Sequence, residues 1–182
     1  TPKPSSAASD VYKRQAVNIA PTLQEKADIA QNAIDLARAL GVQRPKLAVL
    51  CATESVNPSM PATLDAAALS KMADRQQIRG GDIDGPLAFD NAISRVAADQ
   101  KGIVSRVAGD ADILLVPDIE AGNMLYKELT WLAGAGTAGL VLGTRVPVLL
   151  TSRSDSLQAR VNSCAVAVLY ARACAASPVA PS

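Results

Sequence analysis

Residues 151–156, with the sequence TSRSDS, bring several reactive polar groups into one short turn between an apolar run and an expected helix. Arg153 offers a planar guanidinium that can clamp a phosphate through two hydrogen bonds. The serine hydroxyls can donate to a thiolate or to an oxyanion. Asp155 is either a general base or an acid that only caps the helix. A helix-capping role would account for the serines and Asp155 better than for Arg153, so this turn is a candidate anion-binding site.

A second candidate joins an apolar run at 113–116, predicted to be a buried strand, to a helix that Gly122 and Asn123 are expected to open. A loop at the carboxyl end of a strand, followed by a helix, presents free backbone N–H groups to anions and cofactors. Asp118 and Lys127 add a carboxylate and an ammonium group. The simpler interpretation is a well-capped helix after a strand.

A third stretch, residues 79–90, is rich in glycine and aspartate, and its first part, residues 79–86, is predicted to be a loop. Asp82, Asp84 and Asp90 could ligate a metal, but their spacing is not that of an EF-hand loop, so a shaped loop beside a domain interface is favoured. The glycines of the segment 134–136 follow a helix and lack the third glycine of a dinucleotide fingerprint. The sequence contains no histidine, which excludes histidine-based triads and metal sites.

The composition limits the classes of function. The 182 residues suffice for one domain or one and a half. A net charge of +1 provides no field that would attract nucleic acid or a membrane surface, and a single Phe and a single Trp argue against base-stacking modules. Cys51, Cys164 and Cys174 have no metal-binding spacing and indicate reduced thiols. We expect a cytoplasmic protein without a membrane span or secretory signal.

Alternation of the predicted elements indicates an α/β fold with a largely parallel sheet. Strands are expected at 46–52, 113–116, 139–142 and 146–150. Helices are expected from Thr22 to just before Gly41, which is a C′ signal, and at 62–73, 87–99, 123–133 and 157–173. Thr22 and Glu25 form a T-x-x-E capping box, and Lys26 belongs to the polar outer face of that first helix. The expected inward faces of the later helices hold Leu64, Ala68 and Met72, then Ile93 and Val96, then Val161, Ala165, Val168 and Leu169. Residues 1–15 are expected to be a disordered or foreign tail, and 177–182 to fray.

Four stretches together resemble the phosphate acetyltransferase and phosphate butyryltransferase family. They are SVNPSMPATLDAAAL at 55–69, DGPLAFDNAI at 84–93, ADILLVPDIEAGNMLYKEL at 111–129 and VPVLLTSRSDS at 146–156. The likeness extends from about residue 18 to 172. The SRSDS form is most similar to the butyryl-type members and to the transferase half of fused enoyl-CoA hydratase/phosphate acetyltransferase proteins. The resemblance implies a three-layer fold like that of isocitrate and isopropylmalate dehydrogenases.

The resemblance also implies the reaction: acyl-CoA and phosphate exchange to give acyl phosphate and free CoA, without a metal or a covalently bound cofactor. It implies that Ser152 stabilises the developing thiolate and that Arg153 orients the phosphoryl or CoA group. It also implies a general-base aspartate a few residues beyond this pair, where Asp155 is the nearest acid. Asp155 lies closer to the Ser-Arg pair than the family pattern expects. The CoA side is expected to include Asp118, Gly122, Asn123, Lys127 and Ser154.

Members of this family are close to twice this length and have two α/β domains, so we expect residues 16–176 to form a second domain that lacks its first. A homodimer is expected as well. Two alternatives stay open at this point. One is a non-catalytic assembly or partner-binding module of the same fold class, and the other is an isocitrate-type dehydrogenase, which the absent nicotinamide fingerprint and metal-ligand aspartates disfavour.

Overall fold

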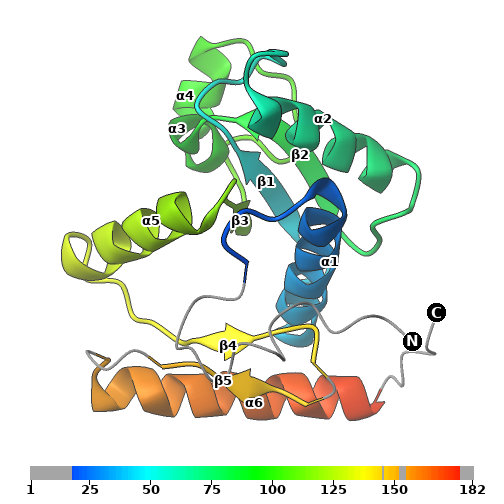
Figure 1. Cartoon of the computed structure of the whole chain (residues 1–182). Coiled ribbons are helices and arrows are strands. Elements are labelled where there is room, and N and C mark those ends of the chain that lie inside the picture. Colours follow the sequence, from blue (N-terminus) through cyan, green and yellow to red (C-terminus); the bar gives the residue numbers. More distant parts are fainter. Residues whose placement is uncertain (1–17, 145, 152–154, 177–182) are drawn as a thin grey trace. The chain divides into compact units, whose positions relative to one another are not determined.

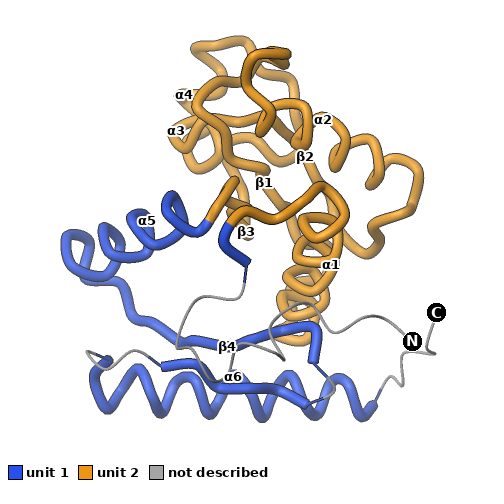
Figure 2. The backbone as a smooth tube through the Cα atoms, viewed as in Figure 1, with its two compact units in different colours: residues 1–19, 119–182 blue, residues 20–118 orange. Residues whose placement is uncertain are grey.

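The computed structural model describes residues 18–144, 146–151 and 155–176. The expected tail at 1–15 and the frayed end at 177–182 lie outside this range. The helices are α1 (Leu23–Ala39), α2 (Pro61–Asp74), α3 (Phe89–Ile93), α4 (Arg95–Gln100), α5 (Ile119–Trp131) and α6 (Leu157–Ala176), and the strands are β1 (Lys46–Leu50), β2 (Asp82–Leu87), β3 (Ile113–Leu115), β4 (Leu140–Val141) and β5 (Val148–Leu149) (Figure 1). Residues 20–118 form unit 2, and residues 1–19 with 119–182 form unit 1 (Figure 2).

Unit 2 contains a three-stranded parallel sheet in the order β2-β1-β3. Leu47 and Val49 of the central strand point to one face and share a buried cluster with α1 and α2. Ala48 and Leu50 point to the other face, where they are also buried and where α3 packs against β1. Burial on both faces explains why this strand is a continuous apolar run. The predicted α/β class with a parallel sheet is confirmed for this unit.

Helix α1 confirms the predicted capping box. The Thr22 hydroxyl accepts from the Glu25 N–H, and the Glu25 carboxylate accepts from the Thr22 N–H at 2.8 Å. Gly41, just beyond the helix, has a φ of +101°, the left-handed conformation that favours glycine after a C-cap. Helix α2 also forms as predicted, and its buried residues are Thr63, Ala66, Leu69 and Ala73. Of the residues expected to face inward, Met72 is partly buried against the core, whereas Leu64 is 44% exposed.

The predicted loop over 79–86 is wrong, because residues 82–87 form β2 and pair in parallel with β1. The strand forms despite its glycine and proline because Ile83 and Leu87 are buried and Gly85 lies against β1. A Cβ atom on Gly85 would lie 2.8 Å from the Cβ atom of Val49. Asp82 forms a bidentate pair with Arg44 instead of facing a metal, at 2.6 and 2.7 Å.

The single helix predicted over 87–99 is divided into α3 and α4 by Ser94, whose hydroxyl caps α4 by accepting from the Ala97 N–H. The expected inward residues Ile93 and Val96 are 49% and 67% exposed. Instead Asn91, Ala92 and Ala98 are buried. The following segment, 102–110, contains no helix among its described residues.

Unit 1 consists of α5, the antiparallel pair β4–β5 and α6. The inward face predicted for α6 is wrong, since Val161, Val168 and Leu169 are each about half exposed (52%, 51% and 48%) and Ala165 is exposed as well. The buried residues of this helix are Ala159 and Ser163. In the part of the chain that the structure describes, no helix is long and apolar enough to cross a membrane.

Candidate functional site

The carboxyl ends of β1, β2 and β3 meet at one edge of the sheet of unit 2. In open parallel sheets ligands bind in the crevice outside these ends. Cys51 follows β1 at this edge, and Asp118 follows β3 after a short turn. Asp118, predicted on the CoA side of the site, is half-buried here. The first turn of α2 lies toward the same edge, because α2 follows the carboxyl end of β1, and Lys26 near the start of α1 pairs with Asp65 of α2.

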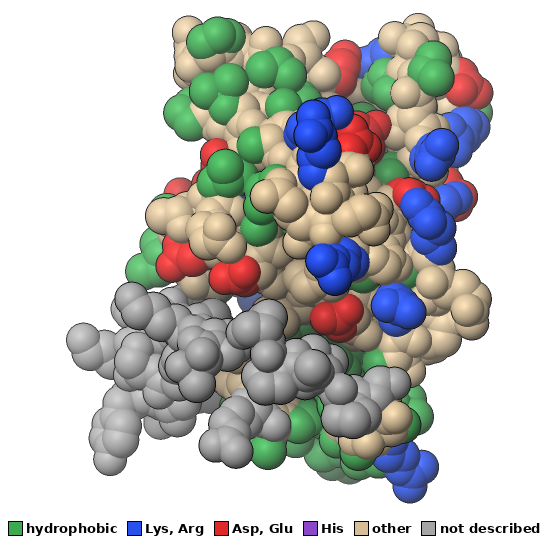
Figure 3. Space-filling model, turned by 90° about the vertical axis from the view of Figure 1, so that its right-hand side faces the viewer, with side chains coloured by type: hydrophobic (Ala, Val, Ile, Leu, Met, Phe, Trp, Pro, Cys, Tyr) green, Lys and Arg blue, Asp and Glu red, His purple; other side chains and the backbone are tan. Residues whose placement is uncertain are grey.

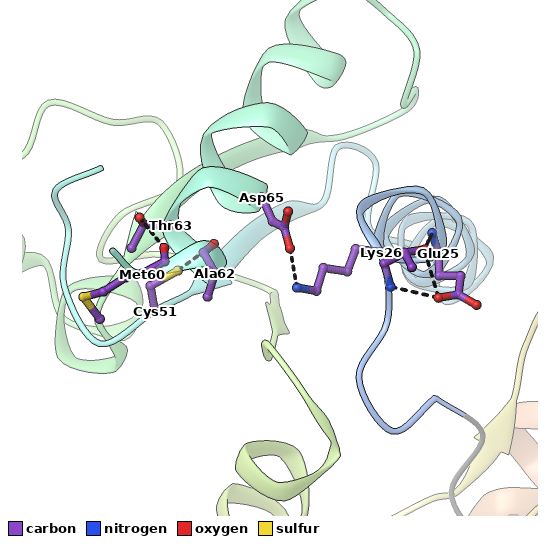
Figure 4. Close-up of polar contacts among 8 residues, drawn as sticks. Glu25, Lys26, Cys51, Met60, Ala62, Thr63 and Asp65 are labelled. Carbon is purple, nitrogen blue, oxygen red and sulfur yellow. Dashed lines mark hydrogen bonds and ion pairs between the residues drawn. The ribbon is translucent and has the colours of Figure 1, made fainter. Parts of the chain in front are cut away.

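A buried ion pair joins these two helical turns. The ammonium group of Lys26 lies 2.6 Å from the Asp65 carboxylate, and the two side chains are 8% and 27% exposed (Figure 4). The predicted outward position of Lys26 is therefore wrong. Polar residues surround Lys26 in the sequence, and only the contact between α1 and α2 supplies the carboxylate that makes its burial tolerable. Elsewhere on unit 2 acidic and basic side chains also lie side by side at the surface (Figure 3).

Cys51 is half-buried and its thiol donates to the carbonyl oxygen of Ala62 at 3.3 Å (Figure 4). Burial raises the pKa of the Cys51 thiol, because a thiolate loses hydration there; Lys26 opposes this rise and Asp65 adds to it. The thiol is accordingly protonated at neutral pH. It is a packing and hydrogen-bonding group rather than a thiolate nucleophile.

The loop after β1 is held in place by one buried hydroxyl. Thr63 accepts from the Asn57 N–H at 2.9 Å, and its oxygen lies 2.8 Å from the Met60 carbonyl and 3.0 Å from the Asn57 carbonyl. These contacts fix residues 57–60 against the first turn of α2. The loop therefore has a fixed conformation beside the carboxyl edge of the sheet.

Helix α5 begins at Ile119, so the prediction that Gly122 and Asn123 open it is wrong. Both residues lie inside the helix, where glycine is tolerated at a cost of about 1 kcal/mol relative to alanine. The Ile119 N–H at the start of α5 donates to the Ile19 carbonyl oxygen at 3.0 Å. One of the amides expected to face an anion is thus already used within unit 1.

Unit 1 contains a pocket of about 250 Å³ between the second half of α5, the segment 135–137 and the start of α6. It brings together Lys127 and Asp155, two of the residues predicted from the sequence. Gly122 and Asn123 do not line it, and Ser152, Arg153 and Ser154 lie outside the described residues. The lining residues are Tyr126, Lys127, Thr130, Trp131, Ala135, Gly136, Thr137, Asp155, Ser156, Gln158, Ala159 and Asn162.

Several pocket contacts were not foreseen from the sequence. The Tyr126 hydroxyl donates to Asp155 at 3.4 Å, and the Lys127 ammonium lies 5.2 Å from the centre of the Tyr126 ring. The Ser156 hydroxyl accepts from the Ala159 N–H at 3.1 Å, so the N-cap of α6 is Ser156. This removes the main alternative to a functional role for Asp155. No sequence pattern predicts this role of Tyr126, because its hydrogen-bond partner Asp155 lies 29 residues further along the chain.

Comparison with known proteins shows what the chain is similar to. The sequence model of the family described as phosphate acetyl/butaryl transferase matches residues 9–168. The chain is 59% identical over 165 residues to a phosphate acetyltransferase of Rhizobium meliloti, covering 91% of the chain and 52% of that relative. It is 52% identical over 156 residues to a phosphate butyryltransferase of Clostridium acetobutylicum, covering 86% of the chain and 52% of that relative.

A solved structure agrees with these matches. The fold is similar to the crystal structure of a branched-chain phosphotransacylase from Enterococcus faecalis V583, with a TM-score of 0.79 and 42% identity over 86% of the chain and 56% of that protein. The chain spans about half the length of the curated relatives it matches.

Proposed function

Because the chain belongs to the phosphate acetyl/butaryl transferase family, we propose that it is the catalytic half of an enzyme that exchanges CoA and phosphate on an acyl group. The observation that carries this proposal is the family match over residues 9–168, together with 59% identity to a phosphate acetyltransferase. We also propose that the chain has the three-layer fold of isocitrate and isopropylmalate dehydrogenases and that the protein is cytoplasmic.

The proposed reaction proceeds by direct transfer. In one direction the CoA thiolate attacks the carbonyl carbon of an acyl phosphate, a carbon–sulfur bond forms, and the carbon–oxygen bond to the phosphate breaks. Phosphate leaves with the electron pair of that bond. In the other direction a phosphate oxygen attacks the thioester, and the CoA thiolate leaves. The group that takes the thiol proton is the general base.

Three residues of the 151–156 turn are proposed to act on the reacting atoms. Arg153 holds the phosphoryl group, because a guanidinium matches two phosphate oxygens in one plane. Ser152 donates a hydrogen bond to the thiolate as its charge develops. Asp155 takes the thiol proton; its hydrogen bond from Tyr126 and its place in the α5–α6 pocket support this role.

The CoA side is proposed to include Asp118, Gly122, Asn123, Lys127 and Ser154. Among these, Lys127 has the strongest structural support, because it lines the same pocket as Asp155. Gly122 and Asn123 would act as parts of the α5 surface and not through free helix N-terminal amides. Acyl phosphate chemistry of this kind needs no metal or covalently bound cofactor.

We further propose that full activity requires a first domain that this chain does not contain. The chain spans about half the length of its relatives, and α6 carries apolar side chains that are exposed in unit 1. Leu157 is 79% exposed, and Val161 and Val168 are each about half exposed (52% and 51%). An apolar helix face of this extent needs cover in a stable protein. A homodimer also remains a proposal.

The acyl group is proposed to be short. Relatives named for acetyl and for butyryl transfer are similarly close, at 59% and 52% identity. Acetyl and butyryl groups differ by two methylenes, each worth about 0.8 kcal/mol in an apolar pocket. We therefore expect both substrates to react. Their kcat/KM values would show which one is preferred.

The test is thiol release from acetyl-CoA and butyryl-CoA by phosphate, measured with the natural full-length parent and with the 182-residue chain. The parent should turn over and the chain alone should be nearly inactive. Arg153→Ala in the parent should lower kcat/KM about 100-fold or more, because the phosphate loses a charged contact. Arg160→Ala, an exposed arginine of α6, is the matched control. A parent without turnover would favour a non-catalytic module, and robust turnover by the chain alone would exclude the need for a first domain.

A further inference from the structure

Asp155, the proposed general base, lies where helix α6 itself does not fix its side chain. The N-cap of α6 is Ser156, whose hydroxyl accepts from the Ala159 N–H at 3.1 Å. Asp155 therefore precedes the cap and lies outside the hydrogen-bonded turns of the helix. A base acts only when it is held within hydrogen-bond reach of the proton that it takes, so a contact from outside α6 has to orient this carboxylate.

Tyr126 of α5 supplies such a contact. Its hydroxyl donates to Oδ1 of Asp155 at 3.4 Å, across a separation of 29 residues in the chain. Both residues line the α5–α6 pocket. Hydrogen bonds of catalytic groups are often long in free enzymes and shorten when the substrate is bound. A distance of 3.4 Å is therefore compatible with a contact that operates during the reaction.

The Tyr126 ring has a second contact that limits its position. The ammonium group of Lys127 lies 5.2 Å from the ring centre, within the range of a cation–π interaction. A tyrosine side chain has only two main rotatable bonds, so fixing its hydroxyl costs little conformational entropy. Tyr126 is therefore suited to present its hydroxyl at a defined point of the pocket.

We propose that Tyr126 is a positioning residue for the general base. It holds Oδ1 of Asp155, and Oδ2 takes the proton of the CoA thiol. The S–H bond breaks, an O–H bond forms on Oδ2, and the electron pair stays on the sulfur, which attacks the acyl carbonyl carbon. Tyr126 keeps its own proton and acts only through Asp155. The inference rests on the proposed acyltransferase function.

The test introduces Tyr126→Phe and Asp155→Ala, alone and together, into the natural full-length parent and follows thioester formation from acetyl phosphate and CoA. Phenylalanine keeps the ring that Lys127 contacts and removes only the hydroxyl. Tyr126→Phe should lower kcat about tenfold, the value of one hydrogen bond to a charged group, and should leave both KM values unchanged. Asp155→Ala should lower kcat about 100-fold or more, and adding Tyr126→Phe to it should cause no further loss.

The separation of kcat from KM distinguishes positioning from a merely structural role, because a distorted pocket would raise the KM values as well. An unchanged kcat for Tyr126→Phe would overturn the proposal. So would a further fall in kcat when Tyr126→Phe is added to Asp155→Ala. Tyr170→Phe is the matched control and should leave kcat unchanged, because it removes the same hydroxyl from a tyrosine of α6 that does not line the pocket.

The contact itself is measured in the 182-residue chain, independently of activity. If the Tyr126 hydroxyl holds Asp155, the shifts in urea midpoint caused by Tyr126→Phe and Asp155→Ala should not add in the double variant. Additive shifts would overturn the proposal. A parent without turnover would reject the acyltransferase function and this role with it. An active parent in which the two substitutions act independently would reject the role of Tyr126 alone.

Discussion

Lys26 of α1 and Asp65 of α2 form an ion pair of 2.6 Å across the two helices that cover one face of the sheet. Both residues lie near the N-terminal ends of their helices. The positive end of the helix dipole disfavours a lysine and favours an aspartate at such positions. Asp65 therefore offsets both the burial of the Lys26 ammonium group and its unfavourable place on α1. The pair fixes the helices beside the carboxyl edge of the sheet.

Asp65→Ala is predicted to lower the free energy of unfolding by about 3 kcal/mol, because it leaves the Lys26 charge buried without a partner. Lys26→Met should cost less, since the Asp65 side chain is 27% exposed and can be hydrated. Urea unfolding followed by circular dichroism measures both values. The control is Lys71→Ala, which breaks a pair whose side chains are both 64% exposed and should cost about 0–1 kcal/mol. Equal effects of Asp65→Ala and Lys71→Ala would contradict the importance of burial.

Cys51 is predicted to react with a disulfide reagent more slowly than Cys164 and Cys174 at pH 8. Both of the latter are exposed, whereas burial raises the pKa of Cys51 and so lowers its thiolate fraction. In the native protein, the reaction with the reagent should show two fast-reacting cysteines and one slow-reacting cysteine. Asp65→Asn should accelerate the slow group, because the Asp65 charge contributes to the raised pKa. Three equal rates in the folded protein would contradict this account.

Local signals in the sequence predicted local structure well. The capping box of Thr22 and Glu25 is confirmed because its hydrogen bonds join residues three positions apart. Strand β2 was missed because its Asp, Gly and Pro residues favour turns. Its pairing partners Lys46 and Leu47 lie more than thirty positions earlier in the chain. A strand stabilised by such distant contacts leaves little trace in its own sequence.

The same distinction applies to the candidate site. Lys127 and Asp155 were predicted from charge near expected helix starts, and both line the α5–α6 pocket. Their neighbours Tyr126 and Trp131 were not predicted, because an aromatic residue at helical spacing is equally typical of a core. The burial of Lys26 could not be predicted either, since it depends on Asp65 of another helix.

Acid is predicted to remove the stabilisation that Asp82 provides. Hydrogen bonds from Arg44 hold the pKa of Asp82 below its ordinary value in the folded protein. A lowered pKa means that the folded state binds the proton less tightly than the unfolded state. The stabilisation is therefore fully present above about pH 4, the unfolded value, and is lost as the pH falls through the folded pKa.

The measurement is the difference in the free energy of unfolding between the natural chain and Asp82→Asn from pH 7 to about pH 3. The difference should be constant at first and should shrink in the acid range. Asp99→Asn, at an exposed position of α4, is the matched control. A difference for Asp82→Asn that grows as the pH falls would contradict the assigned direction.

Gly85→Ala is predicted to destabilise unit 2 by about 1–3 kcal/mol, the usual cost of overpacking a close contact. A Cβ atom at Gly85 would lie 2.8 Å from the Val49 Cβ, 2.9 Å from the Val49 carbonyl oxygen and 3.3 Å from the Ala66 Cβ. The Val49 oxygen belongs to the backbone, so β2 must move away from β1 to accept the methyl group. The matched control is Gly136→Ala, where no atom lies within 4 Å of the added Cβ and the change should stay within about 0.5 kcal/mol. Urea midpoints compare the two variants, and an unchanged midpoint for Gly85→Ala would mean that β2 is not packed against β1 and α2 as closely as these distances require.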